Sequence, residues 1–374
     1  MSFTLCMMTK PVLTFDIEND VPKKIVKIDD ERLLPVALKN NCTPEALANW
    51  LNMRSIPDGR EGYDEIKSSY GDIIKNSKLN YLSLTDPYWV KRRLEDWRKI
   101  NLYDNSYNTF IGDATFTPWD VDIRSKGASA DATTGGMLKK MWRRDQGERV
   151  DYLIKAGSAA FKSEPLHEVL VSAMLEKMKD FIPFVRYDLC VEGLVMCCKC
   201  PNFIHKGEAL VPASDFYFKE KRAENESVFD HLVKMCKKEK IPGAKEFIEK
   251  MIVIDELTGN IDRNLGNIGF IYDAEKGVFK GPAPLYDNGD SYKDTKVFKD
   301  RTPSKLFGDV ERGICDRYTK NIDLSFMEGK IYKKLIYNYP GISEAKRSNL
   351  ITAIENMPSL LKGRNTYVEL GEVR

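Results

Sequence analysis

The sequence has little that would draw it to a membrane or to nucleic acid. It contains no apolar run near the roughly 18 residues of a membrane-spanning helix, and its first residues lack the apolar core of a secretion signal. Its 58 Lys and Arg residues nearly balance its 56 Asp and Glu residues, so the protein has no large positive charge that would attract a polyanion such as nucleic acid. We therefore expect a soluble, cytoplasmic protein that binds neither a membrane nor nucleic acid directly.

Cysteine patterns typical of disulfide-rich or zinc-binding proteins are also missing. The eight cysteines are scattered along the chain, and paired CxxC knuckles are absent. The cluster CCKCPNFIH leaves open a zinc site formed by Cys198, Cys200 and His205. We favour reduced thiols on a half-buried strand.

What the chain does contain indicates several globular units. Its 374 residues are 42% apolar, which is enough for two or three cores. Residues 1–105 read as a mixed α/β subdomain, with PVLTFDI and KKIVKID as strands and a helix capped by Thr43. Residues 106–205 hold a Gly/Ser/Thr-rich run, the strand DYLIKAG and an amphipathic helix with Pro165 in its first turn. Residues 206–374 are expected to be mostly helical.

The run TGNIDRNLGNIGF, between an apolar helix and an apolar strand, is longer and more polar than a turn of about four residues requires. Asp262 is followed five residues later by Asn267, which is the spacing of a kinase catalytic loop. Asp287 and Gly289 then form a D-x-G, as in the metal-binding segment of a kinase. A capped turn would explain Asp262 and Asn267 alone, but not Asp287.

An ion pair is predicted earlier in the chain. Lys155 lies inside the apolar strand DYLIKAG, where a buried lysine needs a carboxylate partner. We expect Glu168, near the start of the next helix, to be that partner, because Glu164 should precede the helix. Taken alone, Lys155 would fit a purely structural pair equally well. The order of Lys155, Glu168, Asp262 and Asp287 is that of a protein kinase, and this favours the catalytic interpretation.

The ordered motifs resemble those of the HipA-like and CtkA-like bacterial serine/threonine kinases. TTGGMLKKMW is similar to the phosphate loop of that family, YLIKAG and EPLHEV to its lysine and glutamate pair, and CPNFI to its hinge. GNIDRNLGNIGF and APLYDNGDSY are similar to its catalytic and metal-binding segments. The resemblance covers roughly residues 106 to 300. It implies an α+β, two-lobed, protein-kinase-like fold with an additional N-terminal subdomain, an N-lobe in 106–205 and a mostly helical C-lobe.

The same resemblance implies ATP and Mg²⁺ as cofactors. It makes Asp262 the catalytic base, with Asn267 and Asp287 as metal ligands. Lys155, supported by Glu168, would lie on the ATP phosphates. The implied reaction is transfer of the γ-phosphoryl group to a protein serine or threonine.

The phosphate loop and the hinge are implied to contact the nucleotide, through Thr133, Thr134, Gly135, Cys200 and Asn202. Family members can also be switched off by phosphorylation of this loop, for which Ser129, Thr133 and Thr134 are the candidate hydroxyls. The resemblance implies a bacterial protein, and delivery into a host cell stays compatible with the expected cytoplasmic location.

One position departs from the family. Where its members usually have D-R-H, this chain has Asp262, Arg263 and Asn264, and Asn cannot carry a proton as His does. A nucleotide-binding pseudokinase or regulatory module is therefore one alternative, and a small-molecule or lipid kinase with the same residues is another. An antitoxin-like or regulatory protein partner is expected, and any contact with DNA would need such a partner.

Overall fold

The computed structural model describes residues 2–70, 80–92, 94–117, 128–160, 162–178, 180–260, 262–292, 305–320, 322–328 and 330–369. The chain divides into two compact units, each built from segments that are separated in sequence. The first unit consists of Met1–Ala156, Cys190–Val211 and Phe270–Lys280. The second consists of Gly157–Leu189, Pro212–Gly269 and Gly281–Arg374. The predicted domain boundaries after residues 105 and 205 stay predictions.

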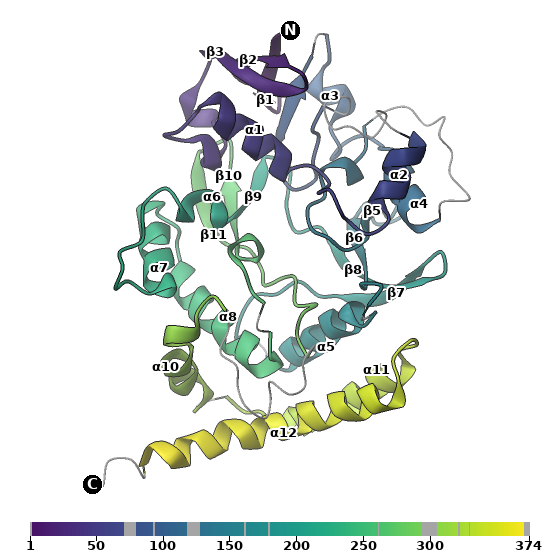
Figure 1. Cartoon of the computed structure of the whole chain (residues 1–374), viewed down its shortest axis with the longest axis vertical. Helices are drawn as coiled ribbons and strands as arrows, with labels where there is room; N and C mark the ends of the chain where they lie inside the picture. The colour runs from purple at the N-terminus through teal and green to yellow at the C-terminus, as the bar shows by residue number, and fades with distance from the viewer. Residues whose placement is uncertain are drawn as a thin grey trace. The chain divides into compact units, whose positions relative to one another are not determined.

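The first unit begins with an antiparallel sheet in the order β3-β2-β1-β4 (Figure 1). Its strands are β1 (Ser2–Met7), β2 (Lys10–Glu18), β3 (Val21–Ile28) and β4 (Tyr88–Lys91). Helix α1 (Pro44–Met53) packs against β3. The Thr43 hydroxyl accepts a hydrogen bond from Ala46 N at 3.1 Å, which satisfies a free donor of the first turn. The predicted strands and the predicted cap are confirmed.

A second four-stranded sheet of this unit has the order β5-β6-β8-β7. Its strands are β5 (Lys140–Arg144), β6 (Asp151–Ala156), β7 (Asp188–Glu192) and β8 (Val195–Pro201). Met141, Ile154 and Cys197 pack on one face with Phe116 of α4 (Phe110–Phe116). Trp142 belongs instead to a cluster with Trp89 and Trp97, whose ring centroids are 5.9 Å apart and whose planes are tilted by 35°. Apolar side chains therefore cover both faces of this sheet.

A third sheet has the order β11-β10-β9. Its strands are β9 (Glu208–Pro212), β10 (Gly269–Asp273) and β11 (Val278–Pro282). The predicted strand GFIYD is β10. The unit also has the short helices α2 (Tyr63–Tyr70) and α3 (Trp97–Ile100) and the 3-10 turns η1 (Glu31–Leu33), η2 (Val36–Leu38) and η5 (Asp131–Thr133).

The second unit is mostly helical in the described residues, as predicted. Its elements are α5 (Glu164–Lys177), α6 (Ser214–Tyr217), α7 (Val228–Lys238), α8 (Ala244–Thr258), η6 (Leu265–Asn267), α10 (Gly308–Thr319), η7 (Ser325–Glu328), α11 (Lys330–Asn338) and α12 (Glu344–Glu369). Helix α10 packs on α8, and α11 packs on both α5 and α12 (Figure 1). None of the described helices is both long and apolar enough to cross a membrane.

The start of α5 corrects one expectation. Glu164 does not precede the helix but is its first residue. Pro165 follows it in the first turn, where the missing backbone N–H of proline costs no helical hydrogen bond. The Glu164 carboxylate accepts hydrogen bonds from Ser158 N at 3.2 Å and from the Ser158 hydroxyl at 2.6 Å. Glu164 therefore fixes the connection that leads into α5.

Candidate active site

The end of α8 determines where the predicted catalytic loop begins. Gly259 has φ +64°, in the left-handed region that glycine adopts most readily, and it terminates the helix. Asn260 N then donates to Asp255 O at 2.8 Å, which satisfies a carbonyl of the last turn. The chain leaves α8 in a fixed direction and passes through Asp262 and Asn264 to η6.

Arg263 is the central residue of this loop. It is 2% exposed, and its guanidinium forms two hydrogen bonds with the buried Asp255 carboxylate, from Nη2 to Oδ1 at 2.6 Å and from Nε to Oδ2 at 2.9 Å. Asn260 Nδ2 donates to the same Oδ1 at 2.9 Å. Burial lowers the pKa of Arg263, but the carboxylates of Asp255, Asp287 and Glu168 together outweigh burial and raise the pKa. The guanidinium therefore stays charged and holds the loop against α8.

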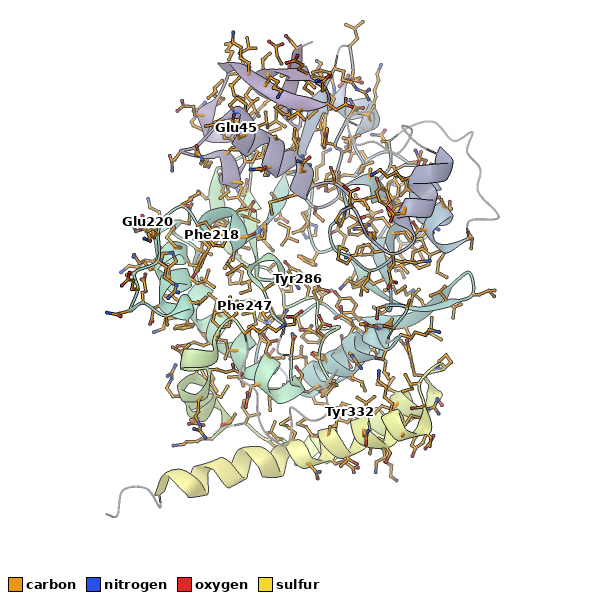
Figure 2. The ribbon with its side chains drawn as sticks, in the orientation of Figure 1. Glu45, Phe218, Glu220, Phe247, Tyr286 and Tyr332 are labelled. Carbon is orange, nitrogen blue, oxygen red and sulfur yellow. The ribbon has the colours of Figure 1, made fainter. Side chains whose placement is uncertain are left out.

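Arg263 also holds the predicted metal-binding segment. Its Nη1 donates to Tyr286 O at 2.9 Å and to Asp287 O at 3.2 Å, and its Nη2 donates to Asn288 Oδ1 at 2.8 Å. The hydroxyl of Tyr286, labelled in Figure 2, donates to Gly266 O at 3.3 Å. One buried cation thus joins the loop that carries Asp262 and Asn267 to the segment that carries Asp287.

Asp287 has an uncommon backbone conformation. Its φ is +58°, a left-handed value that Asp tolerates better than most residues with a Cβ. Asp287 N donates to the Tyr187 hydroxyl at 3.5 Å. Such conformations persist where the surroundings fix them, and they cluster at functional sites.

Helix α5 supports the same segment from another side. The buried Glu168 carboxylate accepts a hydrogen bond from Asn288 N at 2.8 Å, and His167 Nδ1 lies 2.9 Å from Gly289 O. A Cβ on Gly289 would lie 3.3 Å from Glu164 Cβ, so Gly289 packs tightly against the first turn of α5. Glu168 therefore positions the predicted metal-binding segment. Lys155 belongs to the first unit, and its pairing with Glu168 stays a prediction.

The predicted base is reachable from solvent. The side chain of Asp262 is 54% exposed, and its Oδ1 lies 2.7 Å from Lys305 Nζ. Asn264 caps η6, because its Oδ1 accepts a hydrogen bond from Gly266 N at 2.9 Å. This hydrogen bond of Asn264 therefore helps to fix the backbone conformation of the loop between Asp262 and Asn267.

The predicted nucleotide-binding residues gather in the first unit. Lys155 on β6 is 7% exposed and lies directly opposite Cys198 on β8, and opposite residues share one face of a sheet. Cys200, two residues along β8, points to the same face. Asn202 N donates to Asp151 O at 2.7 Å, and Asn202 Nδ2 donates to Leu84 O at 3.0 Å. The end of β8 is thus fixed beside the strand that carries Lys155.

The predicted phosphate loop precedes β5 in the same unit. Ser129 is 1% exposed, and the Thr133 hydroxyl donates to Leu82 O at 2.9 Å. The Thr134 hydroxyl donates to Asp131 O at 2.7 Å. By contrast, a Cβ on Gly135 would meet nothing within 4 Å, so this part of the loop is open. All three candidate phosphorylation sites are directed into the protein.

The zinc interpretation of the cysteine cluster finds no support in the part of the chain that the structure describes. No group of three or more His, Cys, Asp and Glu residues there could hold a metal ion. Cys198 and Cys200 are buried, and burial raises the pKa of the neighbouring Cys197 to about 12. These thiols are packing residues.

Several residues of the site were missed by the sequence interpretation. Asp255 and Asn288 accept hydrogen bonds from Arg263, and His167 contacts the predicted metal-binding segment. A usable signal existed for Asp255, since an acid within the buried run IVIDEL needs a partner.

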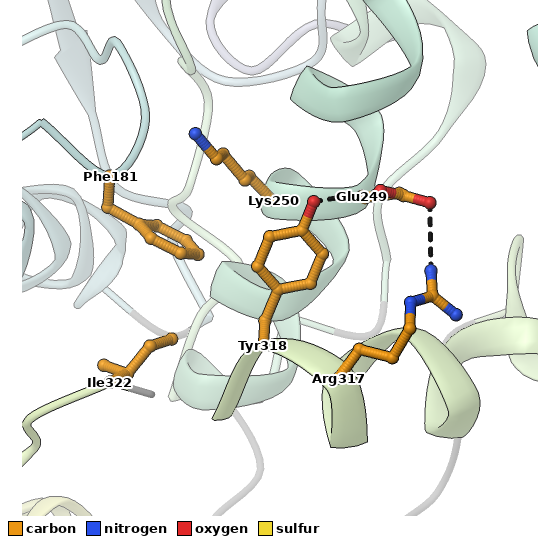
Figure 3. Close-up of a pocket in the computed structure, with 6 residues that line it drawn as sticks. All are labelled: Phe181, Glu249, Lys250, Arg317, Tyr318 and Ile322. Atoms are coloured by element: carbon orange, nitrogen blue, oxygen red, sulfur yellow. Dashed lines mark hydrogen bonds and ion pairs between the residues drawn. The ribbon is translucent and has the colours of Figure 1, made fainter. Parts of the chain in front are cut away.

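A separate pocket of about 430 Å³ lies between α8 and α10 of the second unit (Figure 3). The described residues that line it are Phe181, Glu249, Lys250, Arg317, Tyr318 and Ile322. Glu249 accepts hydrogen bonds from Arg317 Nη2 and from the Tyr318 hydroxyl, each at 2.9 Å. Burial, together with this bond, raises the pKa of Tyr318 to about 12. The pocket contains none of the predicted site residues.

Comparison with known proteins identifies the fold. No protein-family model and no curated protein matches the sequence. HipA of Shewanella oneidensis MR-1, solved with HipB and operator DNA, matches with a TM-score of 0.53 and 13% identity, over 96% of this chain and 96% of that chain. The chain has a HipA-like fold. The Helicobacter pylori proinflammatory kinase CtkA also matches, with a TM-score of 0.46 and 16% identity, over 62% of this chain and 95% of that chain.

The HipA-like fold confirms the predicted fold class, an α+β architecture with several antiparallel sheets and a mostly helical C-terminal part. An identity of 13% is too low to carry residue roles from HipA to this chain. The roles of Asp262, Asn267 and Asp287 must therefore be argued from their own surroundings.

Proposed function

We propose that the protein is an ATP- and Mg²⁺-dependent serine/threonine protein kinase. The observation that carries this proposal is the set of hydrogen bonds from Arg263 to Tyr286 O and Asp287 O. Through them, the proposed base Asp262 and the proposed ligands Asn267 and Asp287 share one rigid support. Phosphoryl transfer depends mainly on positioning and charge stabilisation, so a shared support is what its catalysis requires.

In the proposed reaction, Asp262 accepts the proton of the acceptor hydroxyl as that oxygen bonds to the γ-phosphorus of ATP. The bond from the γ-phosphorus to the bridging oxygen breaks, and ADP leaves. The side chain of Asp262 is 54% exposed, which suits an acceptor presented by another protein. Lys155 would offset negative charge on the ATP phosphates.

Asn267 and Asp287 are the residues that would hold Mg²⁺. An amide oxygen and a carboxylate oxygen fit a hard cation that takes oxygen ligands and usually keeps several waters. When bound, Mg²⁺ would neutralise part of the phosphate charge. The fixed left-handed backbone of Asp287 limits the directions in which its carboxylate can point.

The acceptor is proposed to be a protein serine or threonine, with self-phosphorylation of Ser129, Thr133 or Thr134 as one case. Because these side chains are directed into the protein, the loop would have to leave its position first. HipA, which shares the fold, was solved with HipB and operator DNA. We therefore propose a regulatory, antitoxin-like protein partner, through which any DNA contact would be made.

The experiment is incubation of wild type and Asp262→Ala with ATP and Mg²⁺, followed by intact mass measurement and peptide mapping. Glu220→Ala is the matched control, because it removes a carboxylate of the same unit whose side chain is 40% exposed (Figure 2). We expect phosphate on wild type and on Glu220→Ala but not on Asp262→Ala. We also expect Asp262→Ala to keep its ATP affinity within a few-fold, because the base acts on the acceptor.

The alternatives give different results in the same experiment. A pseudokinase or regulatory module would bind ATP but transfer no phosphate to itself, to a general protein substrate or to a small molecule. A small-molecule or lipid kinase would label only a non-protein acceptor. Equal phosphate gain in wild type and Asp262→Ala would remove Asp262 from the proposed mechanism.

A further inference from the structure

A short segment of the N-terminal region lies against the predicted phosphate loop, within the first unit. Arg60 Nε donates to Gly136 O at 2.8 Å, and Arg60 Nη1 donates to the Thr134 hydroxyl at 2.7 Å. Arg60 Nη2 donates to Thr134 O. Beside these bonds, Glu61 N donates to Met137 O at 3.1 Å. Residues 60 and 61 therefore contact the loop from residue 134 to residue 137.

The environment of Arg60 is unusual for a structural arginine. It is 4% exposed, yet each acceptor in these three bonds is neutral. Burial lowers the pKa of Arg60 to about 10, while the charge of Asp131 acts in the opposite direction. The guanidinium therefore remains charged at neutral pH, and its planar fork fixes three atoms of the loop at once. A buried cation with neutral acceptors costs free energy, which favours a role beyond stability.

The hydrogen bonds of Arg60 also restrict the hydroxyl group of Thr134. Thr134 Oγ1 donates to Asp131 O at 2.7 Å and accepts from Arg60 Nη1, so both of its hydrogen-bonding roles are engaged. Gly136 has φ +86°, a backbone conformation that L side chains rarely adopt. Between these two anchored positions, Gly135 leaves open space. Arg60 thus binds the loop on both sides of Gly135.

We propose that Arg60 is a positioning residue that holds the phosphate loop in the conformation that receives the ATP phosphates. This inference rests on the proposed kinase function. It gives the N-terminal region, whose role the sequence leaves open, a direct part in nucleotide binding. Arg60 acts through the loop, because its hydrogen bonds with Thr134 and Gly136 occupy three of its five donors.

A purely structural role predicts a different result, and Arg54 provides the matched control. Arg54 lies in the same unit, is 9% exposed, and donates to Tyr81 O and Tyr88 O at 3.0 Å and to Asp86 Oδ1 at 2.7 Å. These partners lie outside the phosphate loop. Arg54→Ala should therefore destabilise the first unit without altering the loop directly.

The experiment compares full-length wild type, Arg60→Ala, Arg60→Lys and Arg54→Ala, at a temperature where all four are folded. For each protein, the KM for ATP and kcat are measured, and the Kd for ATP is measured by calorimetry. We expect Arg60→Ala to raise KM and Kd at least tenfold with a smaller change in kcat. Arg60→Lys should recover part of the loss, because one ammonium replaces only part of the fork. Arg54→Ala should stay within twofold of wild type in KM and Kd.

A second readout does not depend on catalysis. Trypsin cleavage after Lys139 and Lys140, followed by mass spectrometry, reports release of the adjoining loop. We expect faster cleavage in Arg60→Ala than in Arg54→Ala. Unchanged ATP affinity in Arg60→Ala, or equal changes in both alanine variants, would overturn the proposed role of Arg60 but not the proposed kinase function. A wild type that binds no ATP would overturn the proposed function and this inference with it, and the cleavage rates would then show only whether Arg60 anchors the loop.

Discussion

Arg263 and Asp255 form a buried ion pair with two hydrogen bonds, of 2.6 Å and 2.9 Å, and their side chains are 0% and 4% exposed. The same guanidinium binds the carbonyl oxygens of Tyr286 and Asp287. The pair therefore supports the predicted catalytic loop and the predicted metal-binding segment together. Removing one partner would leave a buried charge without compensation.

Arg263→Ala and Asp255→Ala are expected to lower the free energy of unfolding of the second unit by about 3 to 5 kcal/mol. Both variants should also lose phosphoryl transfer, because the support of Asp287 is lost. Urea unfolding followed by far-UV circular dichroism measures the first effect. Lys333→Ala is the control, since its pair with Glu355 is 45% and 37% exposed and should contribute only about 0 to 1 kcal/mol. Equal destabilisation of Arg263→Ala and Lys333→Ala would contradict the prediction.

Much of the local structure could be predicted from sequence, because its causes are local. The Thr43 cap, the first-turn Pro165 and the strand around Lys155 each follow from neighbouring residues. The polar run around Asp262 and Asn267 predicted a loop after an apolar helix, and α8 does end at Thr258, while the catalytic role of the loop stays a prediction. The start of α5 was misplaced by one residue at Glu164, since a helix boundary depends on one or two backbone bonds.

The contacts that position the candidate site could not be predicted in the same way. Arg60 binds Thr134, which is 74 residues away in sequence, and Glu168 binds Asn288, which is 120 residues away. Such contacts depend on tertiary packing, and composition or periodicity does not specify them. Local patterns therefore predicted the chemical groups of the candidate site, whose roles stay predictions, and the contacts that support these groups required the structure.

Two helical glycines are expected to respond in opposite ways to alanine. A Cβ on Gly112 in α4 would lie 2.6 Å from Met141 Cβ and 2.8 Å from Asp131 Oδ2, so Gly112→Ala should cost about 1 to 3 kcal/mol through overpacking. Gly313 in α10 is exposed, and a Cβ there would meet nothing within 4 Å. Gly313→Ala should therefore stabilise its helix by about 0.5 to 1 kcal/mol.

The two effects can be measured separately. All five tryptophans lie in the sequence of the first unit, so their fluorescence follows its unfolding. Far-UV circular dichroism also follows the helices of the second unit. If Gly112→Ala leaves the fluorescence midpoint unchanged, the close packing of Gly112 against Met141 is wrong.

The stability of the first unit is expected to fall as pH rises from about 4 to about 7, through Asp131. This carboxyl group is buried and accepts hydrogen bonds from Trp142 N at 2.6 Å and Gly112 N at 3.0 Å. Burial raises its pKa to about 7, although both bonds and Arg143 act in the opposite direction. The folded protein therefore holds this proton more tightly than the unfolded chain, and stability is lost as the proton leaves. A shift of about three pKa units corresponds to about 4 kcal/mol as an upper bound.

Asp131→Asn tests this prediction, because its amide does not titrate. Free energies of unfolding are measured by tryptophan fluorescence between pH 4 and pH 8. The free energy of unfolding of wild type minus that of Asp131→Asn should fall steadily from about pH 4 to about pH 7 and then level off. The amide can satisfy only one of the two backbone donors, and that cost is the same at every pH. A difference that does not vary with pH would contradict the raised pKa of Asp131.

Asn264 is expected to act through the shape of the catalytic loop and not as a proton carrier. Its Oδ1 accepts a hydrogen bond from Gly266 N at 2.9 Å and so caps η6, the turn that ends at Asn267. Asn264→Ala should cost about 1 kcal/mol locally and lower the transfer rate by about tenfold, because Asp262 and Asn267 lose their fixed separation. Asn264→Asp keeps an acceptor at this position and should retain a rate within about threefold of wild type. If both variants lost transfer equally, the amide itself would be required, and capping alone could not explain the need for Asn at this position.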